Sequence, residues 1–534
     1  MHYIQLSKGK IICILVGIFL IGLVLRLLYF DKITITYDQA RDALESMKIW
    51  TSDPFKLRGP ATDIPGITHG PLYWYLISPF YYFSSGNVYV VKVLLILLNL
   101  MGIGIIYWIA KDVFKNKLVG LVSASIYAVS FEVIQYAKWL SNPSPAVITI
   151  PLSYFGLWMI YTKRNIGYIL FFVSWALSVH FQFFLTYQIL LFIALLIYQV
   201  IRAKKDIGWT YLIAGVVCAV IILSPFIVAE IKFDFSGIRA IVGFLSEPKP
   251  LVRSFTEILF LYIDKIALAF YYSVFGLNLA GAGLIMLMMF IGVSYEVINS
   301  KRWVREMVFL VIWLLSPFIL ASFEKNNFYF LIIGTVYPVI LLTSYFLVKI
   351  WSTKYRAYAV LFFVLLILGN LKLITTYNKT GEPLFSVQMM LYGDEKTVID
   401  WIYNDAGGKE FGINTVTNPL FINTTWAFLF DGYARRTYHY MPVWLGYQQD
   451  GNYGAEVKFN GIIPKIGMSY YLIIEPPRGI PDTYIKGIPD YENNRSHLVY
   501  SKDFGEIRVE KRIITKDKYF SRDDLYKVIT TKKY

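Results

Sequence analysis

The sequence has few of the residues on which redox proteins and metalloenzymes depend. It contains two cysteines and five histidines among 534 residues, and only 16% of its residues are charged. Both cysteines, Cys13 and Cys218, fall inside apolar runs, which predicts neither a disulfide framework nor a paired-cysteine metal site. The His, Asp and Glu residues show no close metal-ligand spacing, so the sequence gives no support for a divalent metal cofactor.

Apolar residues are abundant instead. The chain is 56% hydrophobic and 18% aromatic, well outside the balance of ordinary soluble domains. A net charge of +15 would suit a nucleic-acid partner if the basic residues lined one face of a soluble domain. Here they form short clusters between apolar runs, which is typical of membrane topology. We therefore expect a membrane protein whose partners are lipids and not nucleic acids.

Eleven apolar runs approach the ~20 residues needed to cross ~30 Å of hydrocarbon. They are 11–30, 88–110, 118–135, 146–161, 166–180, 183–201, 209–229, 275–298, 304–322, 328–350 and 355–375. The first run is not followed by a small-residue cleavage site, so we expect it to remain as an anchor. The predicted fold is an α-helical polytopic membrane protein with about eleven transmembrane helices.

The distribution of basic residues predicts the orientation of these spans in the membrane. Lys and Arg collect in alternate connections, which marks the cytoplasmic side. The basic residues of this set are Lys8, Lys10, Lys111, Lys115, Lys117, Lys163, Arg164, Arg202, Lys204, Lys205, Lys301, Arg302, Arg305, Lys349, Lys354 and Arg356. The same connections hold only Asp112, Asp206 and Glu306 as acidic residues. We expect a multi-pass protein of the cell membrane with its N-terminus inside and its C-terminus outside.

The long segments then lie on the outer face. They are 31–87, 136–145, 230–274 and everything after the last span. From residue 376 the composition becomes that of a soluble α/β domain, so we divide the chain into a transmembrane domain, 1–375, and an extracytoplasmic α/β domain, 376–534. In the second domain we expect helices over 394–405 and 424–435, and strands over 410–416, 470–475 and 507–511.

The first candidate site is Thr36-Tyr37-Asp38-Gln39-Ala40-Arg41-Asp42, directly after the first span. If 38–50 is helical, Asp38 and Asp42 lie on neighbouring turns of one side, with Arg41 close by. A carboxylate there can deprotonate an acceptor hydroxyl, which is general-base work. The alternative is an ordinary charged helix start, with Asp38 as its cap.

The second candidate site is Thr68-His69-Gly70-Pro71, which opens the aromatic stretch 72–76. This stretch suits a helix lying in the membrane interface. The His69 ring N–H and the free backbone donors of the helix can hold a lipid phosphate. His69 can equally be a polar turn residue without a ligand.

Three further polar residues lie near predicted span ends. Lys138 and Asn142 belong to the outer loop 136–145, where a cation and an amide can bind phosphate or sugar hydroxyls. His180 ends a span and can face the same cavity. An interfacial anchor explains Lys138 equally well, and a polar residue satisfied between helices explains His180.

These residues together resemble a known family. Tyr37 to Asp42, followed some thirty residues later by His69-Gly70-Pro71-Leu72-Tyr73-Trp74-Tyr75, is similar to the first outer loop of prokaryotic lipid-carrier-dependent glycosyltransferases. These enzymes belong to the C-type membrane glycosyltransferase superfamily and include relatives of the protein O-mannosyltransferases and of the aminoarabinose transferase of lipid A. The resemblance extends to 138–143, 179–182 and 504–512. It covers most of the chain as architecture, but its specific motifs cover few residues.

The resemblance implies an inverting transfer from a polyprenyl-phosphate-linked sugar donor to a protein, glycan or lipid acceptor. Asp38 matches the acidic position that acts on the acceptor, and His69 falls where relatives hold the carrier phosphate. Many relatives have Asp-Glu where this chain has Asp38-Gln39, so we assign the second catalytic carboxylate to Asp42. The substrate-binding residues would be Arg41, His69, Lys138, Asn142 and His180. The aminoarabinose branch has a Lys-Pro-Pro turn in place of His69-Gly70-Pro71, which argues against that particular activity.

Three other functions are compatible with parts of the sequence. A transporter would also have many spans, but the matched inverted halves and broken helices expected around a midplane site are not apparent. Another C-type activity, such as an oligosaccharyltransferase or a glycan polymerase, would use the same outer loop. A receptor or assembly protein would use the membrane part as scaffold, and Asp38 with Asp42 favours catalysis over that reading.

Overall fold

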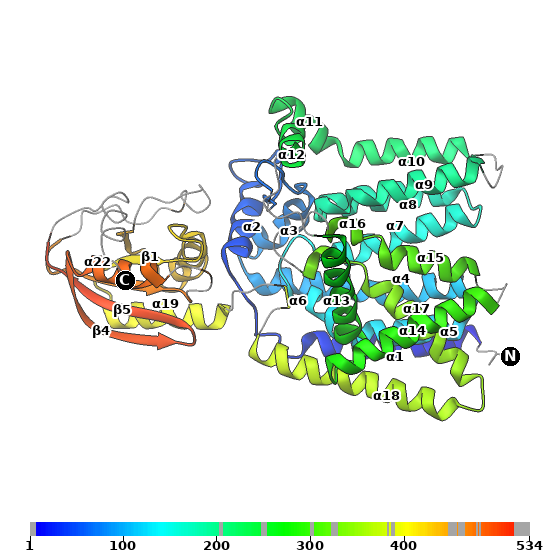
Figure 1. Ribbon diagram of the computed structural model, residues 1–534. Coiled ribbons are helices and arrows are strands. Elements are labelled where there is room, and N and C mark those ends of the chain that lie inside the picture. The colour runs from blue at the N-terminus through cyan, green and yellow to red at the C-terminus, as the bar shows by residue number, and fades with distance from the viewer. Residues whose placement is uncertain are drawn as a thin grey trace. The chain divides into compact units, whose positions relative to one another are not determined.

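The computed structural model describes residues 7–62, 64–201, 207–246, 254–299, 304–321, 329–381, 384–385, 390–446, 457, 465–476, 479 and 482–516. Figure 1 shows the elements along the chain. By their contacts the residues form two compact units. The helical unit contains 1–28, 55–76 and 91–379, and the sheet unit contains 29–54, 77–90 and 380–534. The first outer loop therefore contributes residues to both units, while the predicted domain boundary at 375–376 stays a prediction.

Apolar helices make up most of the helical unit. Their bounds are α1 (Lys8–Leu27), α4 (Val88–Phe114), α5 (Lys117–Val129), α6 (Phe131–Lys138), α7 (Ala146–Tyr161), α8 (Ile166–Phe181), η1 (Phe183–Tyr187), α9 (Gln188–Ile201), α10 (Trp209–Ile222), α11 (Ser224–Lys232), α12 (Ser236–Ser246), α13 (Phe255–Ser273), α14 (Leu279–Asn299), α15 (Val304–Leu315), α16 (Phe318–Ala321), η2 (Tyr329–Ile332), α17 (Val336–Trp351), α18 (Arg356–Leu373) and η3 (Ile374–Asn378). Most lie close to a run predicted from hydropathy, and α7 matches its predicted bounds.

The described helices confirm a membrane protein but not the count of eleven spans. Among the described residues, five helices are long and apolar enough to cross a membrane, and seven if each bent pair counts as one span. The bent pairs are α5–α6, with an angle of 54°, and α10–α11, with 53°. Helices α7, α8 and α17 are apolar but shorter. The remaining predicted spans therefore stay predictions.

Each bend has a physical cause. Proline at the start of α11 lacks the N–H that would continue α10. Between α5 and α6 there is no proline. Ser130 caps the start of α6, where its hydroxyl oxygen accepts a hydrogen bond from the Val133 N–H at 3.5 Å, and a tertiary contact adds to this cap. The Asn370 side chain from α18 accepts a hydrogen bond from the Phe131 N–H at 2.8 Å, which satisfies one free donor at the start of α6.

A buried arginine ties four helices of the helical unit together. The Arg26 guanidinium in α1 donates to Asn99 Oδ1 of α4 at 2.7 Å and to the Ala128 carbonyl of α5 at 3.0 Å. The Asn99 amide in turn donates to the Val133 carbonyl of α6 at 2.9 Å. Hydrogen bonds lower the cost of burying these polar groups, although Arg26 Nη2 is buried without a partner among the described residues.

Polar contacts between the connections agree with the predicted sidedness of the spans. Arg164 forms a two-pronged ion pair with Asp112, at 2.6 and 3.0 Å, and both belong to connections predicted to be cytoplasmic. Lys349 pairs with Glu296, again at predicted cytoplasmic ends. Arg58 donates to Ser236, and both lie in predicted outer segments. These contacts are what the predicted arrangement requires, while the absolute orientation stays a prediction.

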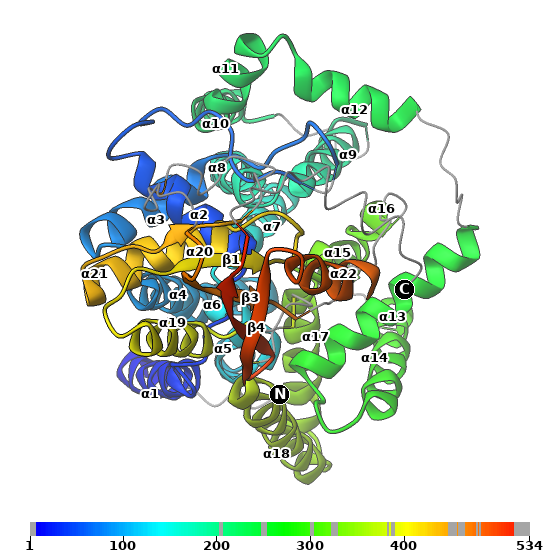
Figure 2. The ribbon, with the colours of Figure 1, turned by 90° about the vertical axis from the view of Figure 1, so that its left-hand side faces the viewer.

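The sheet unit is an α/β structure built around a five-stranded sheet. Its strands are β1 (Gly412–Val416), β2 (Val443–Trp444), β3 (Ser469–Ile474), β4 (Ser496–Phe504) and β5 (Ile507–Ile514), in the order β2-β1-β3-β5-β4. The pairs β1–β2 and β1–β3 are parallel, and β3–β5 and β4–β5 are antiparallel. Figure 2 looks toward the strands of this sheet, of which β1, β3 and β4 are labelled.

Helices cover both faces of this sheet. On one face, Ile488 and Tyr491 of α22 (Asp482–Glu492) pack with alternate strand residues such as Tyr470 and Leu472. On the other face, Trp401 of α19 (Tyr392–Ala406) contacts Tyr471, with ring centroids 5.9 Å apart. Tyr470 and Tyr471 face opposite sides of the sheet because successive side chains of a strand point to opposite faces. The expected helix over 394–405 and the strands over 410–416, 470–475 and 507–511 are confirmed within a few residues.

The other helices of the sheet unit come from widely separated parts of the chain. They are α2 (Tyr37–Lys48), the last turns of α3 (Leu72–Phe83), α20 (Thr424–Leu429), the π-helical turn η4 (Phe430–Ala434) and α21 (Arg435–Tyr438). The expected helices over 38–50 and 424–435 are confirmed, the second as three consecutive pieces. Helix α2 packs against α20, so the first outer loop is held by residues near the end of the chain.

Candidate functional site: the acidic helix α2 and the His69 loop

Helix α2 begins with a side-chain cap that involves Gln39. Gln39 Oε1 accepts hydrogen bonds from the Thr36 backbone N–H at 3.1 Å and from its hydroxyl at 2.6 Å. This is a capping box, which satisfies free groups at a helix start. Gln39 thus has a structural role, and the helix start presents Asp38 in its first turn.

Arg41 holds the two candidate carboxylates in different environments. Its Nη1 donates to Asp38 Oδ1 at 2.6 Å, while its Nε and Nη2 both donate to Asp42 Oδ1, at 3.1 and 3.0 Å. The Asp38 side chain is 58% exposed and the Asp42 side chain 2%. Asp38 is therefore accessible to a substrate, whereas Asp42 lies behind Arg41 and fixes the guanidinium that orients Asp38.

The surroundings of α2 keep Arg41 charged. Burial lowers the pKa of Arg41, but the nearby charges of Asp42 and Asp38 outweigh it and raise the pKa above its ordinary value. Burial and the charge of Asp42 raise the pKa of the Tyr81 hydroxyl, which stays protonated. The third acidic residue of the helix, Glu45, is paired with Lys48 at 2.5 Å. Asp38 is thus the exposed carboxylate of α2.

The second predicted site is part of a short two-stranded loop in the helical unit. The Gly59 N–H donates to the His69 carbonyl at 3.0 Å, and the His69 N–H donates to the Pro60 carbonyl at 2.8 Å. The His69 ring accepts a hydrogen bond at Nδ1 from the Phe183 N–H at 3.1 Å. An Nδ1 that accepts carries no proton, so the neutral ring bears its proton on Nε2 as a donor.

Three of the predicted binding residues meet around the junction between α8 and η1. Besides the contact of His69 with Phe183, Asn142 Nδ2 donates to the Phe181 carbonyl at 2.6 Å. The His180 ring at Nε2 lies 2.7 Å from the Ile222 carbonyl, and the His180 carbonyl accepts from the Gly70 N–H at 3.1 Å. A Cβ on Gly70 would lie 2.0 Å from His180 Nδ1, so only glycine allows this approach. This packing gives His180 and Asn142 defined protein partners, and their substrate roles stay predictions.

In the structure Lys138 contacts a backbone carbonyl. Two further cations near the second candidate site, Lys56 and Arg58, were not predicted from the sequence. Lys138 Nζ donates to the Leu28 carbonyl at the end of α1. Lys56 and Arg58 directly precede the Gly59-Pro60 turn, and Lys56 is buried with its Nζ 5.8 Å from the centre of the Trp74 ring. Arg58 lies 4.0 Å over the Phe233 ring. Their position on either side of Leu57, directly before a Gly-Pro turn, was the signal available in the sequence.

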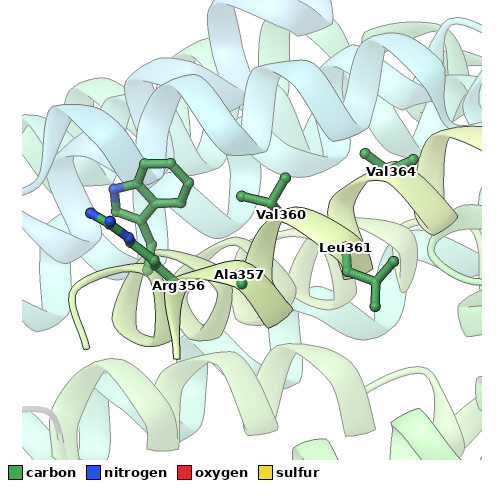
Figure 3. Close-up of a pocket in the computed structure, with 6 residues that line it drawn as sticks. Arg356, Ala357, Val360, Leu361 and Val364 are labelled. Atoms are coloured by element: carbon green, nitrogen blue, oxygen red, sulfur yellow. The ribbon is translucent and has the colours of Figure 1, made fainter. Parts of the chain in front are cut away.

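A groove of the helical unit is lined by Trp351 of α17 and by residues of α18, drawn in Figure 3. The α18 residues are Arg356, Ala357, Val360, Leu361 and Val364. Nothing in this lining is a carboxylate, thiol or imidazole. Within the described ranges, no group of three or more His, Cys, Asp or Glu side chains is placed to hold a metal ion.

Solved structures with a similar fold cover nearly the whole chain. The structure of ArnT from Cupriavidus metallidurans bound to undecaprenyl phosphate matches with a TM-score of 0.59 and 12% sequence identity, over 95% of this chain and 98% of that one. The Archaeoglobus fulgidus oligosaccharyltransferase in its apo form matches with a TM-score of 0.51 and 12% identity, over 92% of this chain and 73% of that one. The same organism's oligosaccharyltransferase AglB, in complex with an inhibitory peptide and a dolichol-phosphate, matches with a TM-score of 0.50 and 13% identity, over 94% of this chain and 74% of that one.

These matches identify the class of fold. No protein-family model and no curated sequence matches the chain. The resemblance to C-type membrane glycosyltransferases, predicted from short motifs, is confirmed at the level of the fold by structures of that class. At 12–14% identity the likeness concerns architecture, and it leaves substrate and residue roles to be argued from the site.

Proposed function

We propose that this protein is an inverting glycosyltransferase that moves a sugar from a polyprenyl-phosphate donor to an acceptor on the extracytoplasmic face. The observation that carries the proposal is the arrangement on α2, in which exposed Asp38 is held by Arg41 and Arg41 is fixed by buried Asp42. A fold similar to that of ArnT, solved with undecaprenyl phosphate, supports a lipid-phosphate donor.

In the proposed reaction Asp38 acts as the general base. The acceptor hydroxyl oxygen attacks the anomeric carbon, and its proton passes to the Asp38 carboxylate. The bond from the anomeric carbon to the phosphate oxygen breaks with its electron pair, which leaves polyprenyl phosphate as the product. Attack from the face opposite the leaving group inverts the anomeric configuration. A neutral hydroxyl is a weak nucleophile, which is why the reaction needs a carboxylate at this position.

The leaving phosphate needs charge stabilisation and no acid catalyst. We assign this task to the His69 loop, which carries the His69 imidazole, with positive charge supplied by Lys56 and Arg58 before the Gly59-Pro60 turn. Lys138, Asn142 and His180 remain proposed substrate-binding residues. The acceptor is a protein, glycan or lipid, and the peptide complex of the similar AglB structure favours an oligosaccharyltransferase-like reaction as the second candidate.

The test is sugar transfer by purified protein in nanodiscs, using radiolabelled polyprenyl-phosphate sugars and following label into protein, glycan and lipid fractions. General-base help is worth ~10²–10⁴-fold in rate, so Asp38→Asn should lower turnover by about that factor while the protein melts at the wild-type temperature. Asp31→Asn is the matched control, because Asp31 is an exposed carboxylate of the same loop that pairs only with its neighbour Lys32 among the ion pairs seen. Near wild-type turnover of Asp38→Asn would exclude Asp38 as the base.

A further inference from the structure

Three aromatic rings are exposed together on the sheet unit. Trp50, Tyr82 and Phe83, here named the Trp50 cluster, are 47%, 41% and 73% exposed. The Trp50 ring stacks on Tyr82 with centroids 5.4 Å apart, and its centroid lies 5.3 Å from that of Phe83. The rings thus form one contiguous aromatic surface, and such surfaces on a protein mark a binding partner.

The backbone on both sides of the cluster is fixed. Directly after α2, the Lys48 carbonyl accepts hydrogen bonds from three successive N–H groups, those of Thr51, Ser52 and Asp53, at 3.1, 3.0 and 2.9 Å. At the end of α3, the Gly86 N–H donates to the Tyr81 carbonyl at 2.7 Å, and Gly86 has φ +83°, which favours glycine. The rings are therefore presented from defined turns.

The side of these turns opposite the exposed rings packs into the unit. Buried Tyr81 meets Phe428 of α20 edge-on, with centroids 6.3 Å apart. A Cβ on Gly86 would lie 3.6 Å from Phe428 and 3.9 Å from Met47 of α2. The end of α2, the end of α3 and α20 are thus one packed assembly, and the Trp50 cluster is its outer surface.

The position of the Trp50 cluster close to α4 in the sequence indicates which partner covers this surface. Phe83 is followed within five residues by Val88, where α4 begins, a helix of 27 residues that is long and apolar enough to cross a membrane. Five residues reach at most ~18 Å, so Phe83 cannot lie far from the end of the hydrocarbon layer. Trp and Tyr are enriched in that interface because each joins an apolar ring to a polar N–H or O–H.

We propose that the Trp50 cluster inserts into the lipid headgroup region at the Val88 end of α4 and sets the depth of α2. The partner is the phospholipid surface itself. Because Trp50 follows α2 by two residues, anchoring the cluster holds the end of the acidic helix at a constant distance from the membrane. This inference concerns membrane contact and does not require the proposed glycosyl transfer.

The experiment measures the depth of a spin label in the full-length protein in phospholipid nanodiscs. Cys13 and Cys218 are replaced by Ser, and a nitroxide is attached to Phe83→Cys. The matched control is Val499→Cys, which is also an exposed apolar position, 46% exposed, but lies on β4 away in sequence from any span. Power saturation compares collisions with oxygen, which concentrates in lipid, and with a water-soluble nickel chelate.

We expect the oxygen-to-nickel accessibility ratio at position 83 to exceed that at position 499 several-fold. Equal ratios at the two positions, in variants that melt like wild type, would overturn the proposal. Spin–spin broadening at position 83 that disappears on dilution with unlabelled protein would also overturn it, because a second copy of the chain would then cover the cluster.

Discussion

At the scale of single residues, Asp38 and Asp42 are the same amino acid in two different environments, and both accept hydrogen bonds from Arg41. Asp38 and Asp42 share the guanidinium of Arg41, but only Asp38 is open to solvent. A helix start with Asp38 and Asp42 one turn apart was predictable from spacing. The difference in exposure was not, because it arises in the tertiary structure, where α2 packs against α20 from far along the chain and Asp42 lies near Tyr81 of α3.

This difference predicts a smaller catalytic effect at Asp42 than at Asp38. Asp42→Asn keeps an oxygen for Arg41 Nε and Nη2 but removes the charge, so we expect a loss of ~1–3 kcal/mol of stability, typical of a hydrogen bond to a charged group. Turnover should fall less than in Asp38→Asn, because Asp38 keeps its basicity. Thermal melting and single-turnover transfer measure the two effects. A turnover loss equal to that of Asp38→Asn in a normally melting Asp42→Asn protein would make Asp42 a direct participant.

His69 should affect use of the donor more than the chemical step. Its Nδ1 accepts a hydrogen bond from the Phe183 N–H, which holds the ring within the loop proposed to bind the carrier phosphate. His69→Ala should therefore raise KM for the lipid-linked sugar more than it lowers kcat. His497→Ala, at an exposed histidine on β4, is the control. An unchanged KM in His69→Ala would exclude His69 from the phosphate site and leave Lys56 and Arg58 as the candidate phosphate-binding residues.

At the scale of elements, two buried acids lie where the helices of the sheet unit meet the sheet. Glu475, at the end of β3, accepts from the Asn418 N–H at 2.6 Å and from Trp426 Nε1 at 2.9 Å. Glu395, in the first turn of α19, is fully buried, and neither of its oxygens has a hydrogen-bond partner in the described part of the chain. Burial raises the pKa of Glu475 to about 8. Burial, and then the charges of Glu475 and Asp394, raises the pKa of Glu395 well above its ordinary value.

These directions predict a fold that weakens as the pH rises. An acid whose pKa is raised on folding binds its proton more tightly in the folded state. Its stabilising contribution is complete below its unfolded pKa of about 4.3 and is lost as the pH rises through about 8 for Glu475. Glu395→Gln removes one of the two acids, so its melting temperature should fall less than that of wild type between pH 5 and pH 9. A difference of ~1 kcal/mol corresponds to roughly 2–4 °C.

The control for this prediction is Glu410→Gln, at an exposed glutamate that precedes β1. It should melt like wild type at every pH. Parallel pH profiles for wild type and Glu395→Gln would contradict the assignment of a proton to the buried pair.

Elements with a strong local pattern were predictable, and those fixed by distant contacts were not. The helix over 146–161 and the strand over 470–475 could be predicted from hydropathy and from the periodicity of their apolar residues alone. Strand β4 is exposed along seven of its nine residues, so it lacks the alternation that marks a strand. Helix α22 contains Pro489, which argues against a helix locally. The start of α6 is supported by Asn370, more than 200 residues away, in addition to its local Ser130 cap.

At the scale of the whole molecule, ion pairs between loops indicate which helix ends lie on the same side of the membrane. Since Lys115 pairs with Asp112, which also pairs with Arg164, the connections after α4 and after α7 must share one side of the membrane. The distribution of Lys and Arg in the sequence predicted that this side is the cytoplasmic one. The architecture was therefore largely predictable, while the way the first outer loop divides between the two units was not, because no local pattern encodes it.

The topology prediction is that Lys115 faces the cytoplasm and Lys409 the outside. Both side chains are exposed, so single cysteines at either position are reachable by reagents. In intact cells an impermeant maleimide should label Lys409→Cys, and it should label Lys115→Cys only after permeabilisation, with Cys13 and Cys218 replaced by Ser in both. Labelling of position 115 in intact cells would reverse the orientation and move the proposed reaction to the other face.

The packing of α2 against α20 also sets an order of events during synthesis. Helix α2 ends at Lys48 and α20 begins at Thr424, so the ribosome must add more than 370 residues before the acidic helix meets its neighbour. At ~5–20 residues per second, roughly 20–80 s pass between the two. During that interval the membrane spans can insert while Asp38, Arg41 and Asp42 remain without their final support. The nascent protein would therefore gain the final support of its candidate catalytic helix only after Thr424 has been added.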